Sequence, residues 1–240
     1  MLETTMQAAK QLRLYGISQS LERRYQEAVA NELNPNEFIR LLLEDEIDYR
    51  KGVKARKLVR QAKFRNLYEL EDWDTSFDRG ITKAKQKELA LLNFYHKTQN
   101  LIILGKTGEG KTHIAISLGK RLCDDGTSVS FFSVNLLFEE LQAQKAAGTY
   151  LKFIQKIKKI EALILDDFAL RNYSHEEANL LLELLEERYR NGIVILTSQV
   201  DSKGWKSLFE DPVIAEAIVD RLINPSDTIK LKGGSYRERL

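Results

Sequence analysis

The amino-acid sequence predicts an α/β fold, a parallel sheet flanked by helices, with a small all-helical domain at the N-terminus. From residue 101 onward, short apolar runs of strand length alternate with helical patterns, as in proteins with parallel sheets. A glycine-rich motif of the phosphate-loop (P-loop) type follows the first of these runs. Residues 1–66 contain only helical patterns. We therefore expect a helical domain at 1–66, a connecting arm and helix at 67–100, and a P-loop domain at 101–240.

The first hundred residues are expected to be mainly helical. We predict one helix from Thr4 or Thr5 to Tyr15, ending at Gly16, a second from Gln19 to Asn31, and a third beginning at Pro35. Residues 67–80 show no clear periodicity, which is typical of a connecting arm. A further helix is expected at 81–94 and leads into the first strand.

The P-loop domain is expected to alternate strands and helices. Strands are predicted at 101–104, 128–134, 162–165, 193–197 and 228–231. Helices are predicted at 113–123, 135–147, 175–190 and 212–223. Because the strands are apolar throughout, both faces of the sheet are expected to be covered.

The segment GKTGEGKT fits the P-loop pattern G-x-x-x-x-G-K-[ST] and lies between a predicted strand and a predicted helix. Its glycines allow backbone N–H groups to turn around a polyphosphate, and the helix N-terminus adds positive potential. We expect Lys111 to reach the β- and γ-phosphates and the Thr112 hydroxyl to bind Mg²⁺. The residues predicted to bind the nucleotide are Gly105, Lys106, Thr107, Gly108, Glu109, Gly110, Lys111, Thr112 and His113. The alternatives are an empty glycine-rich turn and, for His113, a role in packing the helix start.

Two adjacent acids end the apolar run ALIL at residues 162–165. A carboxylate at the C-terminal end of a buried parallel strand lies at the edge where phosphates bind. We expect Asp166 to hold Mg²⁺, directly or through water, and Asp167 to orient or activate the attacking water. The alternative is a solvated acidic turn.

Four further residues, from three segments, are candidates for contacts to the γ-phosphate. The run IVIL at 193–196 is followed by polar residues, of which Ser198 or Gln199 could bond the γ-phosphate or the water; capping of the strand end is the alternative. Arg221 lies on an amphipathic helix, where it could instead pair with Asp220 or Glu216. Arg188 has the same ambiguity.

A basic segment from Arg50 to Arg65 contains eight cationic side chains and no acid. We predict that it binds the backbone of duplex DNA without sequence preference, because contacts to phosphates carry no base information. The alternative is a solvated helix face neutralised by the acids at 44–48. The residues predicted to contact DNA are Arg50, Lys51, Lys54, Arg56, Lys57, Arg60 and Lys63.

Composition excludes several classes of protein. The 240 residues are 43% hydrophobic and 30% charged, which is ordinary for a soluble globular protein. The single cysteine, Cys123, excludes a disulfide framework and a cysteine-based zinc site, and fits a reducing cytoplasm, where we expect the protein to be. No apolar stretch is long enough to span a membrane, and no signal-peptide core begins the sequence.

Several segments together resemble the IstB family, the ATP-binding transposition helpers encoded beside a transposase in bacterial insertion sequences. In the second half of the chain they are GKTGEGKTHIA, LILDDF, ERYRNGIVILTSQ, IVDRLI and LKGGSYR. In the first half they are LRLYGISQSLER, LLEDEIDYRKGVKARKLVRQAKF and LEDWD. The family belongs to the AAA+ class, close to DnaC-type helicase loaders, and the resemblance covers essentially the whole chain.

The resemblance implies a function and a set of roles. It implies an ATPase that uses ATP and Mg²⁺, forms a ring or helical filament on duplex DNA and assists a transposase in DNA recombination. Walker A is implied at Gly105–Thr112 and Walker B at Asp166 and Asp167. Sensor 1 is implied near Ser198, and Arg221 is implied to be an arginine finger that acts on a neighbouring subunit's nucleotide.

Two departures from the AAA+ pattern affect these expectations. AAA+ proteins often have glutamate where this chain has Asp167, so hydrolysis is expected to be slow. The chain stops nine residues after Leu231, which leaves no room for a helical lid, and Arg237 is a candidate to replace the sensor 2 arginine.

The other functions considered are a DnaC-type helicase loader, a P-loop kinase for a small metabolite, and a nucleotide-binding module without turnover. The kinase requires an acceptor-binding lid with arginines, which the sequence does not contain.

Overall fold

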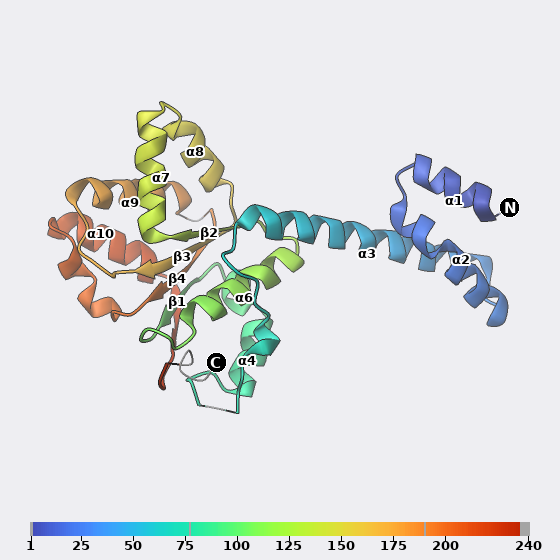
Figure 1. Ribbon diagram of the computed structural model, residues 1–240, viewed down its shortest axis with the longest axis horizontal. Helices are drawn as coiled ribbons and strands as arrows, with labels where there is room; N and C mark the ends of the chain where they lie inside the picture. The colour runs from blue at the N-terminus through green and yellow to red at the C-terminus, as the bar shows by residue number, and fades with distance from the viewer. Residues whose placement is uncertain (1, 77, 190, 236–240) are drawn as a thin grey trace. The chain divides into compact units, whose positions relative to one another are not determined.

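The computed structural model describes residues 2–76, 78–189 and 191–235. The chain divides into two compact units (Figure 1). The first comprises Met1–Lys57 with Asp124–Gly126, and the second comprises Leu58–Cys123 with Thr127–Leu240. The domain boundaries expected after residues 66 and 100 stay predictions.

The first unit contains the helices α1 (Leu2–Gln11), α2 (Tyr15–Ala30) and most of α3 (Pro35–Ala62). The prediction that a helix ends at Gly16 is wrong, because α1 ends at Gln11 and Gly16 lies in the first turn of α2. The Gly16 N–H donates to the Glu46 carboxylate at 2.7 Å. A Cβ at Gly16 would lie 2.5 Å from the carbonyl oxygen of Asp45. Glycine is therefore needed for the close approach of α2 and α3, not for a helix end.

Ion pairs fix α2 against α3 in this unit. The Arg24 guanidinium donates to both carboxylate oxygens of Asp45 at 2.8 Å. The same hydrogen bonds lower the pKa of Asp45 to about 2. Few apolar side chains of the unit's described residues are buried, among them Ala9 and Leu21, so this bidentate pair carries much of the specificity of the packing.

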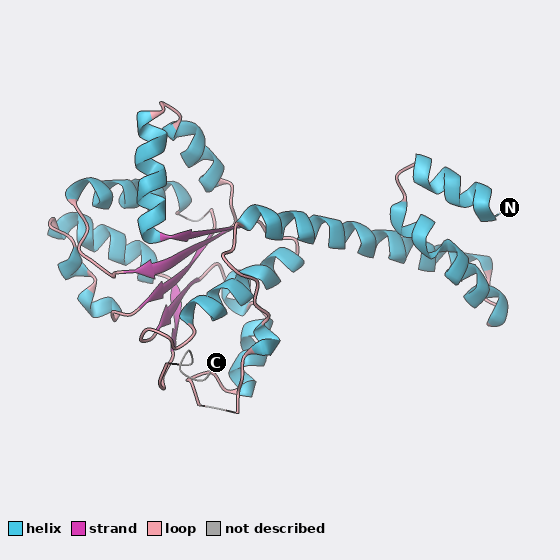
Figure 2. Ribbon diagram, in the orientation of Figure 1, coloured by secondary structure: helices cyan, strands magenta, loops and turns pink. Residues whose placement is uncertain are grey.

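The second unit is built on a five-stranded parallel sheet with the strand order β2-β3-β4-β1-β5 (Figure 2). The strands are β1 (Asn100–Leu104), β2 (Val129–Ser133), β3 (Ala162–Phe168), β4 (Ile193–Ser198) and β5 (Ser226–Lys230). The predicted α/β fold is confirmed, and every predicted strand overlaps an observed one. The order places β4 between β1 and β3, so the P-loop and the paired acids lie on either side of the end of β4.

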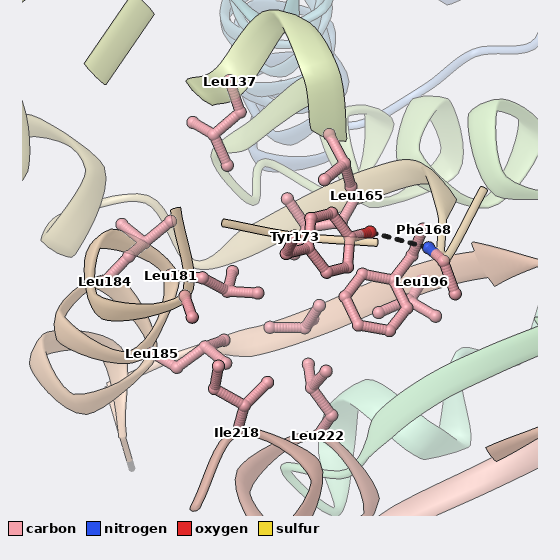
Figure 3. Packing of buried hydrophobic residues seen from close by; sticks show 14 of the residues in the cluster. Leu137, Leu165, Phe168, Tyr173, Leu181, Leu184, Leu185, Leu196, Ile218 and Leu222 are labelled. Carbon is pink, nitrogen blue, oxygen red and sulfur yellow. Dashed lines mark hydrogen bonds between the residues drawn. The ribbon is translucent and has the colours of Figure 1, made fainter. Parts of the chain in front are cut away.

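Helices cover both faces of the sheet. One face is covered by α7 (Val134–Ala146), α8 (Tyr150–Lys158), α9 (His175–Arg188) and α10 (Pro212–Ile223), and the other by α4 (Lys83–Ala90), α5 (Asn93–His96) and α6 (Lys111–Asp124). Single 3₁₀ turns lie at η1 (Leu70–Asp72), η2 (Ser202–Gly204) and η3 (Lys206–Leu208). A hydrophobic core lies on each face of the sheet. Alternate residues of β1 belong to the two cores, since Ile102 and Leu104 pack on one side and Leu101 and Ile103 on the other. Figure 3 shows the first of these cores.

The structure differs from the expected helices at two further places. The helix expected at 81–94 is broken into α4 and α5, because Leu92 has a left-handed φ of 52°. Helix α8 was not predicted. None of the helices in the described ranges is long and apolar enough to cross a bilayer.

Candidate active site

The P-loop joins the C-terminal end of β1 to the first residue of α6, as predicted. Gly108 and Gly110 have φ values of +82° and +96°, which side-chain-bearing residues rarely adopt. A Cβ at Gly110 would lie 2.6 Å from the Trp73 ring. Glycine is therefore required at position 110 by backbone conformation and by space.

Lys111 lies inside the loop, with 6% of its surface exposed. Its ammonium group donates to the carbonyl oxygen of Lys106 at 3.0 Å. The buried Glu109 carboxylate accepts the Lys106 N–H at 2.6 Å, so the loop also closes on itself. The Lys111 charge is thus held where a polyphosphate in the loop would lie.

Asp166 is fully buried at the end of β3 and faces two hydroxyl groups. The Thr112 Oγ1 lies 2.9 and 3.1 Å from its two carboxylate oxygens, and the Thr197 hydroxyl donates to Oδ1 at 2.6 Å. Burial, and then the charge of Asp167, raise the pKa of Asp166, which these hydroxyl contacts partly offset. The predicted pairing of Thr112 with Asp166 is present in the structure, whereas Thr197 was not predicted.

Asp167 lines the cavity in front of the P-loop, whereas Asp166 is fully buried against Thr112 and Thr197. A β-bulge between Leu165 and Phe168 interrupts the pairing with β4, and Asp167 has a left-handed φ of 61°. Its N–H donates to Thr197 Oγ1 at 2.9 Å. The bulge lets two consecutive acids face the site, since a regular strand would send them to opposite faces.

A cavity of about 530 Å³ lies in front of the P-loop. Its walls combine loop residues with Asp167, Gln199 and residues of the arm that precedes α4. The Tyr68 ring stacks on the His113 ring at 4.5 Å between centroids, and both residues line the cavity. Burial lowers the pKa of His113, and its Nε2 has no hydrogen-bond partner among the described residues. Aromatic rings at the wall of a cavity are suited to stacking on a nucleotide base.

The arm also brings a cation to the cavity. The Arg79 guanidinium lies 3.7 Å from the centroid of the Trp73 ring and donates to the carbonyl oxygen of Asp74 at 3.2 Å. Only 4% of Arg79 is exposed, and the residue lines the cavity. No site residue was predicted in the arm, because its chemistry depends on packing and not on a motif.

The structure separates the two candidates at the end of β4. The Ser198 hydroxyl donates to the carbonyl oxygen of Val200 at 3.0 Å and accepts the Val200 N–H at 3.1 Å, and Ser198 does not line the cavity. Gln199 lines the cavity and accepts a hydrogen bond from the Thr107 hydroxyl at 2.9 Å. Ser198 is placed as a turn residue, and Gln199 is placed at the site.

Arg221 is not brought to the cavity of its own chain. Its guanidinium donates to the Glu186 carboxylate at 2.7 Å and to the carbonyl oxygen of Ala217 at 3.0 Å, so neither of the expected acids is its partner. The Asn100 side chain donates to the Arg221 carbonyl oxygen at 2.9 Å. Asn100 begins β1 and the P-loop follows its end, a separation of about 13 Å along the strand.

Arg188 is a structural residue. Its buried guanidinium donates to the carbonyl oxygens of Ile157, Ile160 and Ile193 at 2.6 to 3.1 Å, and burial lowers its pKa to about 10.

We predict that Arg188→Ala lowers the free energy of unfolding by about 3 kcal/mol, because buried carbonyl groups lose their donors. Chemical denaturation measures this change. The exposed Lys206→Ala serves as the control and should change stability by less than about 0.5 kcal/mol; an equal effect of both variants would contradict the assignment.

The side chains predicted to contact DNA are all exposed. Arg50 pairs with Glu46 at 2.7 Å and Lys51 lies 3.7 Å from Asp48. No ion pair to a described residue involves the other five, Lys54, Arg56, Lys57, Arg60 and Lys63. Arg237 lies outside the described residues.

The donor set at the site fits Mg²⁺. The Thr112 hydroxyl and the Asp166 carboxylate supply hard oxygen ligands side by side. No group of three or more His, Cys, Asp or Glu residues that could hold a metal occurs in the described ranges. Magnesium is commonly bound in this manner, through one carboxylate together with phosphate oxygens and water.

Comparison with known proteins identifies close relatives. The family model "IstB-like ATP binding protein" matches residues 7–240. The "Insertion sequence IS21 putative ATP-binding protein" of Pseudomonas aeruginosa is 35% identical over 228 residues, which are 94% of this chain and 85% of that protein. An insertion-sequence protein of Mycobacterium tuberculosis with a similar name is 34% identical over 233 residues, 97% of this chain and 93% of that protein.

Solved structures share the fold. The crystal structure of DnaI has a TM-score of 0.56 and 24% identity, covering 75% of this chain and 92% of that chain. The DnaC helicase loader has a TM-score of 0.58 and 20% identity, covering 68% of this chain and 96% of that chain. AMPPCP-bound DnaA from Aquifex aeolicus has a TM-score of 0.58 and 19% identity, covering 73% of this chain and 53% of that chain. At these identities the likeness concerns the fold alone.

The fold and the site define a P-loop protein built on a five-stranded parallel sheet. The parallel sheet, the glycine loop and the acids at the end of β3 all agree with this class. The chain belongs to the family of IstB-like ATP-binding proteins, whose model covers nearly its whole length. The predicted resemblance is confirmed.

Proposed function

We propose that this protein is a DNA-binding AAA+ ATPase that assembles on target DNA and assists a transposase in the transposition of an insertion sequence. The observation that carries the ATPase part is the contact of Thr112 with Asp166 beside a cavity that Lys111 and Asp167 also line. The link to transposition rests on the relatives, which are named for insertion sequences.

Nucleotide binding uses both the loop and the arm. The backbone amides of the P-loop and the Lys111 ammonium bind the β- and γ-phosphates. The ring pair of Tyr68 and His113 stacks on the adenine, and Arg79 adds positive charge to the wall of the cavity. The cavity volume of about 530 Å³ is in the range of small-molecule sites.

Hydrolysis of the γ-phosphate depends on residues that bind the metal, activate the attacking water and sense the γ-phosphate. Thr112 and Asp166 would hold Mg²⁺, and the ion would supply positive charge to the phosphate oxygens. Asp167 orients and deprotonates the attacking water, and Gln199 replaces Ser198 as the residue that senses the γ-phosphate. Because the Asp167 side chain is one methylene shorter than glutamate, we expect turnover to be slow.

Completion of the site requires a second subunit. Arg221 lies on α10, and its carbonyl oxygen contacts Asn100 at the start of β1, away from its own P-loop. We therefore expect its guanidinium to act on a neighbour's nucleotide. An interface of this kind joins different surfaces of two copies and generates a ring or a helical filament. When subunits assemble, Arg221 would leave Glu186 and pair with the neighbour's γ-phosphate, and this change of partner would couple assembly to hydrolysis.

The exposed cations of α3 bind the phosphate backbone of duplex DNA. We predict that replacing Lys54, Lys57 and Arg60 by Gln weakens duplex binding on all sequences, since these side chains make no ion pair to a described residue. The log–log salt slope should become shallower by about 0.9 for each phosphate that the variant no longer neutralises. Fluorescence anisotropy over a salt series measures both quantities.

A matched variant controls for the loss of charge. Lys87, Lys97 and Lys206 are exposed, so their replacement by Gln removes the same charge elsewhere. Equal weakening by both triple variants, or an unchanged salt slope in the first, would show that α3 does not bind DNA through these cations.

One experiment separates the proposed function from its alternatives. Phosphate release is measured with ATP alone, with ATP plus duplex DNA, and with a transposase or a replicative helicase added to the DNA. The proposed function predicts slow release that DNA stimulates. A kinase would transfer phosphate only when an acceptor is added, and a module without turnover would release none. A helicase loader would be stimulated by a replicative helicase and not by a transposase.

A further inference from the structure

The segment that follows Asp166 has an unusual backbone. Asp167 and Ala169 both adopt left-handed φ values, 61° and 65°, although neither is glycine. Such conformations are costly for residues with a Cβ and persist only where the surroundings enforce them. Phe168, between them, is fully buried, so the bulge is anchored in the core. The conformation that presents Asp167 to the cavity therefore depends on contacts outside the site.

Two hydroxyl groups hold the bulge, one at each end. At the first end, the Thr197 hydroxyl accepts the Asp167 N–H. At the other end, the Tyr173 hydroxyl accepts the Ala169 N–H at 2.7 Å, the dashed line in Figure 3. Tyr173 is 2% exposed, and burial raises its pKa to about 12, so the hydroxyl is neutral at neutral pH.

The Tyr173 ring is itself fixed by aromatic neighbours. It stacks on Phe168 at 5.6 Å and on Phe209 at 5.1 Å between centroids, and meets Phe138 edge to face at 5.5 Å. Its N–H donates to the carbonyl oxygen of Leu208 at 2.9 Å. A ring held on three sides places its hydroxyl at one point in space.

We propose that Tyr173 is a positioning residue for hydrolysis: its hydroxyl fixes the bulge at Ala169 and thereby the direction of the Asp167 carboxylate. The inference rests on the proposed ATPase function and adds a residue to it. Without this acceptor, the buried Ala169 N–H is unpaired, and the bulge relaxes toward a common conformation. Asp166 is held independently by Thr112 and Thr197, so nucleotide and metal binding should persist.

The variant Tyr173→Phe removes the hydroxyl and keeps the ring. We expect kcat for ATP hydrolysis to fall about tenfold, because a small displacement of a catalytic group is costly. The dissociation constant of a non-hydrolysable ATP analogue should stay within about twofold. Tyr150→Phe is the matched control, since it removes a hydroxyl that bonds Glu183 at 2.7 Å on α9 and should leave kcat unchanged.

A double-mutant cycle distinguishes positioning from general damage. In the Asp167→Asn background, Tyr173→Phe should have no further effect on kcat, because the two residues act as one unit. A full additional loss in that background, or a parallel weakening of analogue binding, would overturn the inference in favour of a structural role. The thermal midpoints of all four proteins, measured without nucleotide, establish that each is folded.

Failure of the inference and failure of the proposed function give different results. If Asp167→Asn hydrolyses ATP as fast as the parent, the proposed role of Asp167 fails and the inference fails with it. If Asp167→Asn is slow while Tyr173→Phe matches the parent, the ATPase proposal stands and the role of Tyr173 is refuted.

Discussion

Lys111→Ala should abolish measurable ATP binding, whereas Asp167→Asn should bind ATP normally and hydrolyse it at least a hundredfold more slowly. Lys111 provides the buried ammonium group of the P-loop, and its removal leaves the phosphates without that charge. Asparagine has nearly the size of aspartate but cannot accept a proton, and general bases contribute about 10²- to 10⁴-fold to rate. Titration with a fluorescent ATP analogue and single-turnover hydrolysis measure the two effects.

The exposed Lys206→Ala is the control for the loss of a lysine and should behave as the parent in both assays. Equal losses of affinity in Lys111→Ala and Asp167→Asn would contradict the division of roles. Loss of binding in the second variant alone would indicate that Asp167, and not Asp166, holds the metal.

Arg221→Ala should reduce DNA-stimulated hydrolysis by about 10³- to 10⁵-fold, the range that arginine fingers contribute in other nucleotide hydrolases. In the proposed mechanism the guanidinium neutralises charge that develops on the γ-phosphate of a neighbour's nucleotide, since Arg221 does not line its own cavity. Binding of ATP to the isolated subunit should be unchanged, because Arg221 does not line its cavity. Steady-state phosphate release on long duplex DNA measures the rate.

The ion pair of Arg221 with Glu186 supplies the control for this prediction. Glu186→Gln frees the guanidinium without removing it, so hydrolysis on DNA should be retained or increased. If Arg221→Ala and Glu186→Gln lower the rate by similar factors, the ion pair is simply structural and the trans role fails.

Most of the sheet was predictable because its strands are buried on both faces. ALIL at 162–165 and IVIL at 193–196 are continuous apolar runs, and only a covered parallel sheet suits them. Helix α8 was missed although Thr149 precedes it at the N-cap position and Ile154 and Ile157 recur at helical spacing, so both signals were present in the sequence. Gly16 was misread because a glycine at a helix contact looks, in sequence, like a glycine at a helix end.

The site was predictable where one motif carries the chemistry. The P-loop follows from its motif, and the acids at 166 and 167 follow from their place at the end of an apolar run. Thr197 was missed because its role depends on β4 lying between β1 and β3, and no local sequence pattern predicts this order of strands. Tyr68 and Arg79 were missed for a similar reason, since the arm reaches the cavity only through packing. The Ser198 assignment depended on which of three consecutive polar residues faces the site, and that is decided by the turn to Val200.

Mixing of two inactive proteins tests whether a neighbour's Arg221 completes each ATP site. Lys111→Ala and Arg221→Ala subunits are combined in equal amounts on long duplex DNA, and phosphate release is compared with that of each protein alone. We expect recovery of a substantial fraction of the parent rate, because an intact P-loop of one subunit meets an intact Arg221 of the other. A mixture as inactive as its components, from subunits shown to co-assemble on DNA, would contradict the role of Arg221 in trans.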